Sequence, residues 1–590
     1  FLFDIEATMA GIGLLIEGPF ANGKGSYIAS FRQAFLKHII KNAGITAIPE
    51  YWNSQTKFVY NIDNKNKLIF NAVGGWDMIK LEDENNPQLR GAENVDHEGY
   101  QHTAGVTYKS LFSKKGYYLF SIGNTTSSWD SEAYRYENWG KNIYFNRKNM
   151  ESDNFIKGDI VYKLSDKLEI STGLNIKQGH YKLNENADPD TVFNYFYPYI
   201  EDRDTYNTTT LDDYYTLIEN NPDYDYMNYY EFINQIPDDV IIDEEYFYMI
   251  NNGFDSNPSG TLWKYAAYTQ MKFSLKKFII TSGLRFDRVP YNNTMVAAPR
   301  IGASFSFTPF TKFNVAYGKF YQTPFYWMLM NPNNSKPLKH RYTYQQVAGI
   351  EHYFSSDIKG TIEIYNKTYH NKPVYISDTT IDSLDERLGF IDSGLARSKG
   401  LEFFLQKKIA DQWYGTFSYS LSESETKDSR PWSNAYYPSD YDYKNVLTLI
   451  GGYKFKFRES RWYQKFRESS VFPYVSWIPF MASDQLEVSF RYRYSGGRPY
   501  TSKNYLFRNR RWFIHSNDDY NTSRYNYYSS LDIMLLRRFN FKKINLTTFI
   551  DIQNVFNRDN EWAIMYLDDG TTEMAYQYKQ FPVGGIIIEF

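Results

Sequence analysis

The sequence predicts an all-β protein, a 22-stranded antiparallel transmembrane β-barrel with short turns at one end and long loops at the other. Three observations carry this prediction. Apolar and polar residues alternate with period two in runs along the whole chain, short and long connections alternate between these runs, and the chain ends inside a strand at Phe590. A soluble sandwich or propeller would not sort its connections by length in this way, and no repeat of blade length is present.

The terminal stretch 581–590 reads Phe-Pro-Val-Gly-Gly-Ile-Ile-Ile-Glu-Phe. Because strand side chains alternate between two faces, Ile586, Ile588 and Phe590 share one face and Glu589 lies on the other. A strand without a polar tail needs a neighbour, and pairing with the first strand would close a cylinder without free edges. We therefore expect the last and first strands to pair.

The alternating runs give each predicted strand one apolar and one hydrated face. In one run Leu486, Val488 and Phe490 alternate with Glu487 and Arg491. The predicted strands are 1–9, 12–20, 25–35, 54–62, 66–78, 98–112, 116–128, 153–164, 167–181, 262–274, 277–289, 297–308, 311–322, 341–354, 358–370, 395–408, 411–424, 442–456, 485–496, 527–540, 543–556 and 580–590. Their even number returns both termini to one side of the membrane, which we expect to be the periplasm.

Composition is consistent with a membrane barrel and excludes several other classes. Aromatic residues make up 19% of the 590 residues, an excess that suits two interfacial girdles. No run of about 18 apolar residues occurs, so a transmembrane helix is not predicted. The chain has no cysteine for disulfides or thiolate sites, and its net charge of −3 comes without a long basic tract for nucleic acid.

One connection on the expected periplasmic side, 457–484, is too long for a tight turn. Its mixture of basic and aromatic residues allows an interfacial amphipathic helix or a docking surface. The alternative is a floppy insertion, that is, a flexible segment without a defined function that rests at the membrane rim.

The longest predicted external loop, 182–261, is strongly acidic. Between Tyr181 and Ile250 it holds 17 acidic residues, opposed only by Lys182 and Arg203. Clustered carboxylates at short spacing can bind a divalent cation, and the tyrosines can stack on a ligand or partner; a solvated loop that only shields the pore is the alternative. The metal candidates are Asp223, Asp225, Asp243, Glu244 and Glu245, and the contact candidates are Tyr214, Tyr215, Tyr226, Tyr229 and Tyr230.

Tyr326 and Trp327 follow the predicted strand that ends at Thr323-Pro324. They are further candidates for ligand or partner contact, with a place in the aromatic girdle favoured as the alternative. No Ser/His/Asp array or phosphate-binding glycine loop is evident, so an enzyme is not predicted. Pairs such as Arg285 and Asp287 are interpreted as charges on the lumenal wall.

Several stretches resemble TonB-dependent outer-membrane receptors, and they occur in that family's order over nearly the whole chain. Pro299–Ser306 with Val315–Pro324 resembles the family's mid-barrel hairpin, and Asp551–Asn557 resembles the end of its penultimate strand. Ser393–Glu402 and Ile588–Phe590 also resemble family segments, as do Glu17–Phe20 with Gly25–Tyr27 for the first hairpin. Tyr492–Thr501 is similar to members from Bacteroidota.

The resemblance implies an outer-membrane importer for a ferric siderophore, glycan, peptide or vitamin, energised by the TonB–ExbB–ExbD complex through a plug domain. It implies outer-membrane lipids and, in Bacteroidota, a SusD-like surface lipoprotein as partners. Neither a plug nor a coupling box precedes Phe1, and we expect the plug to exist outside this sequence. A scaffold barrel within a larger outer-membrane complex is the alternative function. No cofactor is expected beyond a possible loop-bound cation.

Overall fold

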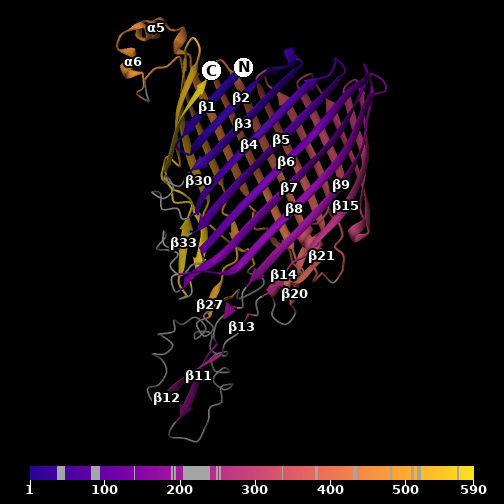
Figure 1. Ribbon diagram of the computed structural model, residues 1–590, viewed down its shortest axis with the longest axis vertical. Coiled ribbons are helices and arrows are strands. Elements are labelled where there is room, and N and C mark those ends of the chain that lie inside the picture. Colours follow the sequence, from indigo (N-terminus) through magenta and orange to yellow (C-terminus); the bar gives the residue numbers. More distant parts are fainter. Residues whose placement is uncertain are drawn as a thin grey trace.

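The chain forms one closed antiparallel barrel of 22 strands, with both termini at the same end (Figure 1). The computed structural model describes residues 1–35, 47–81, 94–137, 140–187, 190–191, 195–202, 240–247, 250–251, 254–334, 336–378, 383–428, 435–476, 478, 481–506, 511–513, 520–567 and 570–590. We call the end that carries both termini the terminal end and the opposite end the loop end.

The barrel strands are β1 (Leu2–Thr8), β2 (Gly11–Phe20), β3 (Gly25–Phe35), β4 (Ala47–Asn61), β5 (Asn66–Leu81), β6 (Asn94–Ser113), β7 (Gly116–Glu137), β8 (Gly140–Lys163), β9 (Leu168–Ala187), β15 (Ser259–Leu275), β16 (Phe278–Val289), β17 (Thr294–Ser306), β18 (Thr311–Gln322), β19 (Arg341–Tyr353), β20 (Ile358–Asp378), β21 (Ser383–Ala410), β22 (Trp413–Lys427), β24 (Asn445–Phe455), β25 (Gln485–Ser495), β30 (Tyr528–Asn540), β31 (Asn545–Gln553) and β34 (Phe581–Glu589). Each pairs with its neighbours in the barrel, and the predicted number of strands is confirmed.

Two short strands extend the barrel wall at the loop end. β14 (Phe254–Ser256) pairs with β9 and so continues the pairing of β15 with that strand. β23 (Tyr437–Pro438) pairs with β22 on the loop-end side of the stretch that pairs with β24. Among the described residues, five small antiparallel pairs lie outside the barrel sheet. They are β10 (Asp190–Thr191) with β13 (Ile250–Asn251), β11 (Tyr195–Asp202) with β12 (Val240–Phe247), β26 (Pro499–Tyr500) with β29 (Ser523–Arg524), β27 (Asn504–Leu506) with β28 (Arg511–Phe513), and β32 (Glu561–Tyr566) with β33 (Thr572–Tyr576).

The first and last strands close the barrel, as expected from the terminal strand pattern. β1 pairs with β34 from Asp4 opposite Glu589 to Thr8 opposite Gly585. The Phe590 backbone N–H adds a hydrogen bond of 2.9 Å to the Phe3 carbonyl, and the two phenyl rings lie 5.8 Å apart. Every strand of the barrel therefore has a partner on both sides, which removes the unpaired edges of an open sheet.

The outer wall carries a belt of exposed apolar side chains. Leu174, Ile122 and Ile364 are each about half exposed or more, and the neighbouring inward positions on the same strands include Asn175, Ser121 and Glu363. Aromatic rings gather at both margins of this belt. Phe112 stacks with Tyr162 at the terminal end, whereas Tyr317 stacks with Tyr344 toward the loop end. An apolar exterior around a polar interior is the inverse of a soluble barrel and suits a lipid surrounding.

Several strands extend well past the belt at the loop end, which corrects the predicted boundaries. The stretch 129–152, expected to be a loop, belongs largely to β7 and β8. Its outward side chains form ion pairs, such as Lys148 with Asp130 and Lys141 with Glu132 at 2.9 Å. Because these charges stand on the outer face, the apolar alternation that marks a membrane strand is absent there. Similarly, β20 and β21 take up most of the predicted loop 373–394.

Turns at the terminal end are short, with one exception. The loop end also has short connections, among them residues 9–10 and the turn η5 (Pro290–Asn292), after which Asn293 adopts a φ of 50°. The turn η1 (Ala21–Gly23) joins β2 to β3 at the terminal end. Alternation of short and long connections is thus a good guide to topology here, but not a strict rule.

The exception is the connection between β24 and β25, which we call the rim hairpin (residues 456–484). It contains a short turn η6 (Phe457–Glu459), helix α5 (Arg461–Glu468) and helix α6 (Phe472–Val475). Tyr463 and Phe472 from these helices are buried against Phe539 of β30. The interpretation as a floppy insertion is therefore wrong, because the segment packs on the barrel. No helix among the described residues is long and apolar enough to span a bilayer.

Candidate functional site

The connection between β18 and β19 folds into the mouth of the barrel at the loop end. It carries the one-turn helix α4 (Tyr326–Leu329), which begins two residues after Pro324. Of the two buried apolar clusters among the described residues, this segment forms the larger with the inner wall. The members are Tyr181, Leu183, Leu262, Val289, Tyr326, Leu329, Met330, Leu338 and Phe390. We call it the mouth cluster.

Hydrogen bonds fix the ends of this inward segment. Asn292 donates from Nδ2 to the Leu338 carbonyl at 2.6 Å, and Asn334 donates to the Met328 carbonyl at 2.6 Å. Asn334 also accepts the Phe390 backbone N–H at 2.8 Å, which ties the segment to β21. These bonds satisfy backbone groups of the helix, of the segment that follows it and of β21 that would otherwise be left without a partner.

Tyr326 is the polar centre of the mouth cluster. Only 5% of it is exposed, and its hydroxyl donates a short hydrogen bond to Asp153 Oδ1 on β8. The Lys264 ammonium lies 4.1 Å from the centre of the Tyr326 ring, and Lys177 Nζ lies 3.4 Å from Asp153 Oδ2. Burial, with a further contribution from Asp153, raises the pKa of the Tyr326 phenol well above its ordinary value. The phenol is therefore a neutral hydrogen-bond donor at physiological pH.

A cavity of about 370 Å³ opens beside Tyr326, and we call it the mouth cavity. Arg285 donates to both oxygens of Asp287 on its wall, with Nε 2.8 Å from Oδ2, so the predicted pairing of these two residues is confirmed. The charged residues that line the cavity are Glu151, Asp153, Asp287, Lys177, Lys264, Arg285 and Arg288. Groups of both signs stand within reach of one solute, so the cavity can bind polar or zwitterionic groups by hydrogen bonds and ion pairs.

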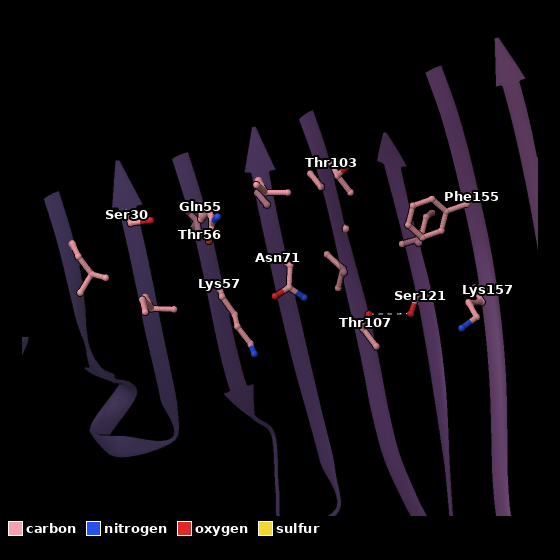
Figure 2. A pocket seen from close by; sticks show the side chains of 18 residues that line it. Ser30, Gln55, Thr56, Lys57, Asn71, Thr103, Thr107, Ser121, Phe155 and Lys157 are labelled. Carbon is pink, nitrogen blue, oxygen red and sulfur yellow. Dashed lines mark hydrogen bonds between the residues drawn. The ribbon is translucent and has the colours of Figure 1, made fainter. Parts of the chain in front are cut away.

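A second cavity, of about 600 Å³, follows the inner wall from β2 to β8 (Figure 2). Its polar lining consists mainly of hydroxyl and amide side chains, and Thr107 Oγ1 lies 2.9 Å from Ser121 Oγ. Lys157 pairs with Asp159 at 2.8 Å, which leaves Lys57 as the cation without an ion pair on this stretch of described wall. The lining side chains labelled in the figure are Ser30, Gln55, Thr56, Lys57, Asn71, Thr103, Thr107, Ser121, Phe155 and Lys157.

The wall near the C-terminus is charged instead. Asp532 on β30 is buried and bonds Arg491 Nη2 at 2.7 Å and Arg493 Nη2 at 3.0 Å. It also accepts the backbone N–H of Asn554 at 3.0 Å. The lumen thus has a stretch lined mainly by hydroxyl and amide groups at the second cavity and an ion-paired stretch along β25 and β30. Any solute or domain inside the barrel meets two chemically different walls.

The structure brings together only part of the candidate set. Tyr326 and Trp327 lie in the mouth cluster, where Trp327 packs edge-on against Phe390 at 5.3 Å. The girdle interpretation is therefore wrong for both, because the segment turns inward rather than toward lipid. Asp243, Glu244 and Glu245 lie on β12, opposite Tyr199, Pro198 and Tyr197 of β11. The candidates that lie outside the described residues are Tyr214, Tyr215, Asp223, Asp225, Tyr226, Tyr229 and Tyr230.

No described group of three or more His, Asp or Glu side chains is arranged to hold a metal ion. The partners of Tyr326, namely Asp153, Lys177 and Lys264, were not singled out from the sequence. They are separated from it by up to 173 positions along the chain, and no local spacing indicates that they meet. The available signal was that each occupies an inward position of its strand close to the loop end.

Comparisons with known proteins agree with this architecture. The family model described as TonB dependent receptor-like, beta-barrel, matches residues 80–555. The chain therefore belongs to the TonB-dependent receptor family, a class of transport proteins of the Gram-negative outer membrane. A search of curated protein sequences returned no match.

Solved structures of similar fold include three receptors that match the whole chain. FpvA from Pseudomonas aeruginosa bound to a heterologous pyoverdine is 12% identical, with a TM-score of 0.64 and 71% of its own length covered. BauA, the ferric preacinetobactin receptor from Acinetobacter baumannii, is 12% identical, with a TM-score of 0.62 and 79% coverage. Fiu, the ferric-catecholate import receptor from Escherichia coli K12, is 10% identical, with a TM-score of 0.63 and 81% coverage.

Proposed function

We propose that this barrel is the wall of an active importer that takes up a scarce nutrient across the outer membrane. The loop end faces outside and receives the substrate, and the terminal end faces the periplasm. The single observation that carries the proposal is a closed barrel of this family with a polar lumen and a charged cavity at its loop-end mouth. A ferric siderophore, glycan, peptide or vitamin fits such a lumen.

Ferric siderophores come first among these substrates. FpvA binds pyoverdines, BauA is a receptor for ferric preacinetobactin, and Fiu is an import receptor for ferric catecholates. Because these receptors have low identity to this chain, they support its fold alone. The uptake experiment therefore also includes the other three substrate classes, glycan, peptide and vitamin. The mouth cavity has both cationic and acidic groups and does not by itself select among them.

The energy for import would come from the TonB–ExbB–ExbD complex through a plug domain, encoded with this chain or supplied separately. The lumen suits such a plug, because charged groups on β25 and β30 can hold it and the stretch lined mainly by hydroxyl and amide groups adheres less. We further propose a host among Bacteroidota, on the basis of the Tyr492–Thr501 stretch, and a SusD-like lipoprotein over the loop end.

Substrate contact is assigned to the loop end. Tyr326, on the wall of the mouth cavity, and Trp327, partly buried against the mouth cluster, would contribute at the mouth. Tyr214, Tyr215, Tyr226, Tyr229 and Tyr230 would contribute from the acidic loop. Asp223, Asp225, Asp243, Glu244 and Glu245 would hold a divalent cation if the loop is stabilised by one.

Uptake in cells tests the proposal. Strains with and without the gene for this chain are compared for accumulation of labelled ferric siderophores, oligosaccharides, peptides and vitamins, each with and without a protonophore. Accumulation of one class that requires both the gene and the proton gradient supports the importer. Equal accumulation in both strains for every class, with the barrel purifying as one subunit of a larger outer-membrane complex, would favour the scaffold.

A further inference from the structure

The rim hairpin presents a surface that import through the lumen does not require. It leaves the barrel between β24 and β25 at the terminal end and projects sideways beyond the wall (Figure 1). A segment in this place does not cover the pore. It overhangs the region that lipid occupies around a membrane barrel.

The hairpin is held in one orientation on the barrel. Asp484, with 2% of its surface exposed, accepts hydrogen bonds from Arg467 Nη1 at 2.5 Å and from the Asn540 backbone N–H at 2.6 Å. Arg467 Nη2 also donates to the Asn540 carbonyl at 2.7 Å, and Arg537 donates to the Ile478 carbonyl at 2.8 Å. Together with the buried Tyr463, Phe472 and Phe539, these contacts hold both helices against the wall.

An aromatic row connects the apolar belt to helix α5. Tyr453 and Phe455 are exposed on the outward face of β24, with ring centres 4.6 Å apart. Phe455 stacks on Phe457 at 5.7 Å and 12°, and Phe457 contacts Trp462 at 5.4 Å. Trp462 is 54% exposed. The belt thus continues without a break from the strand onto the hairpin.

Further apolar side chains on the hairpin are exposed. Val471 is 54% exposed, and Tyr474, on α6, is 77% exposed. Neither belongs to the buried cluster that docks the hairpin. Tryptophan, tyrosine and aliphatic side chains on an overhanging element are typical of the bilayer interface, where one end of the side chain is apolar and the other is hydrated.

Basic side chains accompany this apolar surface. Lys456, Arg458, Arg461 and Lys465 are exposed, and none of them forms an ion pair within the part of the chain that the structure describes. Arg461 and Lys465 are four residues apart, so they lie on one face of α5, beside the position of Trp462. Long basic side chains beside interfacial aromatic residues can reach phosphate groups while their methylene stems stay on apolar surface.

We propose that the rim hairpin is an interfacial anchor that binds the phosphate headgroups of anionic phospholipids at the terminal end of the barrel. Trp462, Val471 and Tyr474 enter the boundary between headgroups and acyl chains, and Arg461 and Lys465 contact the phosphates. The anchor marks one sector of the wall at the terminal end. The inference rests on membrane insertion of the barrel and is independent of the transported substrate.

A single label tests the anchor. The chain lacks cysteine, so Ser470→Cys, in the exposed link between α5 and α6, gives one attachment point for a fluorophore. The labelled full-length protein is placed in nanodiscs of phosphatidylcholine alone or mixed with phosphatidylglycerol, each with a brominated-acyl lipid as quencher. We expect quenching in both discs, from the apolar contacts, and stronger quenching in the anionic disc, from the cations.

Charge reversal distinguishes specific contact of Arg461 and Lys465 with the headgroups from general attraction between the protein and anionic lipid. Arg461→Glu with Lys465→Glu should abolish the difference between the two discs, whereas Lys276→Glu with Lys277→Glu, the same charge change in the tight turn between β15 and β16, should preserve it. Trp462→Ser should reduce quenching in both discs. Folding of each variant is checked by the heat-dependent shift of the barrel on a gel.

Quenching that is absent from both discs, or unchanged by the Arg461 and Lys465 reversal in a folded protein, would overturn the proposal. The proposal would also be overturned, in favour of a protein partner, if lipid leaves the fluorescence of the label unquenched but a soluble periplasmic protein changes that fluorescence. None of these readouts depends on uptake, so failure of the anchor and failure of the importer are distinguishable.

Discussion

The Tyr326 phenol lies directly against the backbone of Gly179 on β9, so close that a methyl group at residue 179 would come within 2.6 Å of the ring carbon Cζ. This contact lets the inward segment rest on the barrel wall with its hydroxyl on Asp153. Glycine is needed here for its lack of a side chain rather than for an unusual backbone angle. The mouth cluster therefore depends on one small residue of the wall.

Gly179→Ala should displace Tyr326 and loosen α4, with a local cost of about 1–3 kcal/mol for overpacking. Hydrogen exchange should accelerate at the amides of Leu329 and Met330, which bond the carbonyls of Phe325 and Tyr326 at 2.9 and 2.8 Å. Gly158→Ala on β8 is the matched control, because an added methyl group there meets nothing within 4 Å. Equal protection in both variants would mean that the contact does not hold the segment.

The inside and outside of the wall can be distinguished at two adjacent residues of β20. Ile364 is 56% exposed on the outer belt, whereas Glu363 points into the lumen. Ile364→Arg should destabilise the barrel in lipid by roughly 2–4 kcal/mol, the cost of an arginine facing the middle of a bilayer. Glu363→Arg should cost little, because the lumen is hydrated. Denaturant titration in vesicles measures both, and a reversed ranking would refute the assignment of the faces.

Asp484→Ala should release the rim hairpin while leaving the barrel closed. It leaves Arg467 and the Asn540 N–H without their acceptor, and removal of one partner from a buried pair costs roughly 3–5 kcal/mol. Trypsin should then cut at Arg461 and Lys465 at lower enzyme concentration than in the unaltered protein. Glu468→Ala, on the exposed side of the same helix, should leave the cleavage unchanged. Resistance of Asp484→Ala to trypsin would mean that aromatic packing alone holds the hairpin.

Acidification should open the mouth segment. His340 at its end is almost fully buried, and burial lowers the pKa of the imidazole, with nearby Lys264 acting in the same direction and Asp287 opposing it. The unfolded segment binds a proton below the ordinary pKa of about 6.5, and the packed segment does not. The stability that neutral His340 gives the segment is therefore fully present above about pH 6.5 and decreases as the pH falls below that value toward the lowered pKa.

This pH dependence is measured by hydrogen exchange of the Leu329 and Met330 amides, corrected for the intrinsic exchange rate at each pH. His340→Gln should flatten the profile, whereas His352→Gln, at a partly exposed position near the opposite end, should not. A profile that is flat in the unaltered protein, or unaffected by His340→Gln, would assign the opening to another group.

The sequence supports prediction of the barrel because membrane strands obey a local rule. Alternation such as Leu486, Val488 and Phe490 against Glu487 and Arg491 is visible in any short window, and the count of 22 follows from it. The rule fails where strands leave the apolar belt. Asp130 and Lys148 are paired across β7 and β8, yet their alternation carries no apolar signal, so this hairpin was predicted as a loop.

The candidate site was predictable only in part for a different reason. Tyr326 and Trp327 were identifiable as aromatic residues after a strand end, but their inward turn depends on Gly179, Leu262 and Phe390, which are distant in sequence. Docking of the rim hairpin likewise depends on Asp484 meeting Asn540 across two strands. Such long-range contacts have no periodic signature.

Entry of a nutrient through the loop-end mouth for energised import is best measured as uptake in cells that carry wild-type, Gly179→Ala or Gly158→Ala protein at equal surface levels. We expect accumulation that a protonophore abolishes, that Gly179→Ala reduces severalfold and that Gly158→Ala leaves unchanged. Accumulation that resists the protonophore, or that is the same in all three strains, would contradict it.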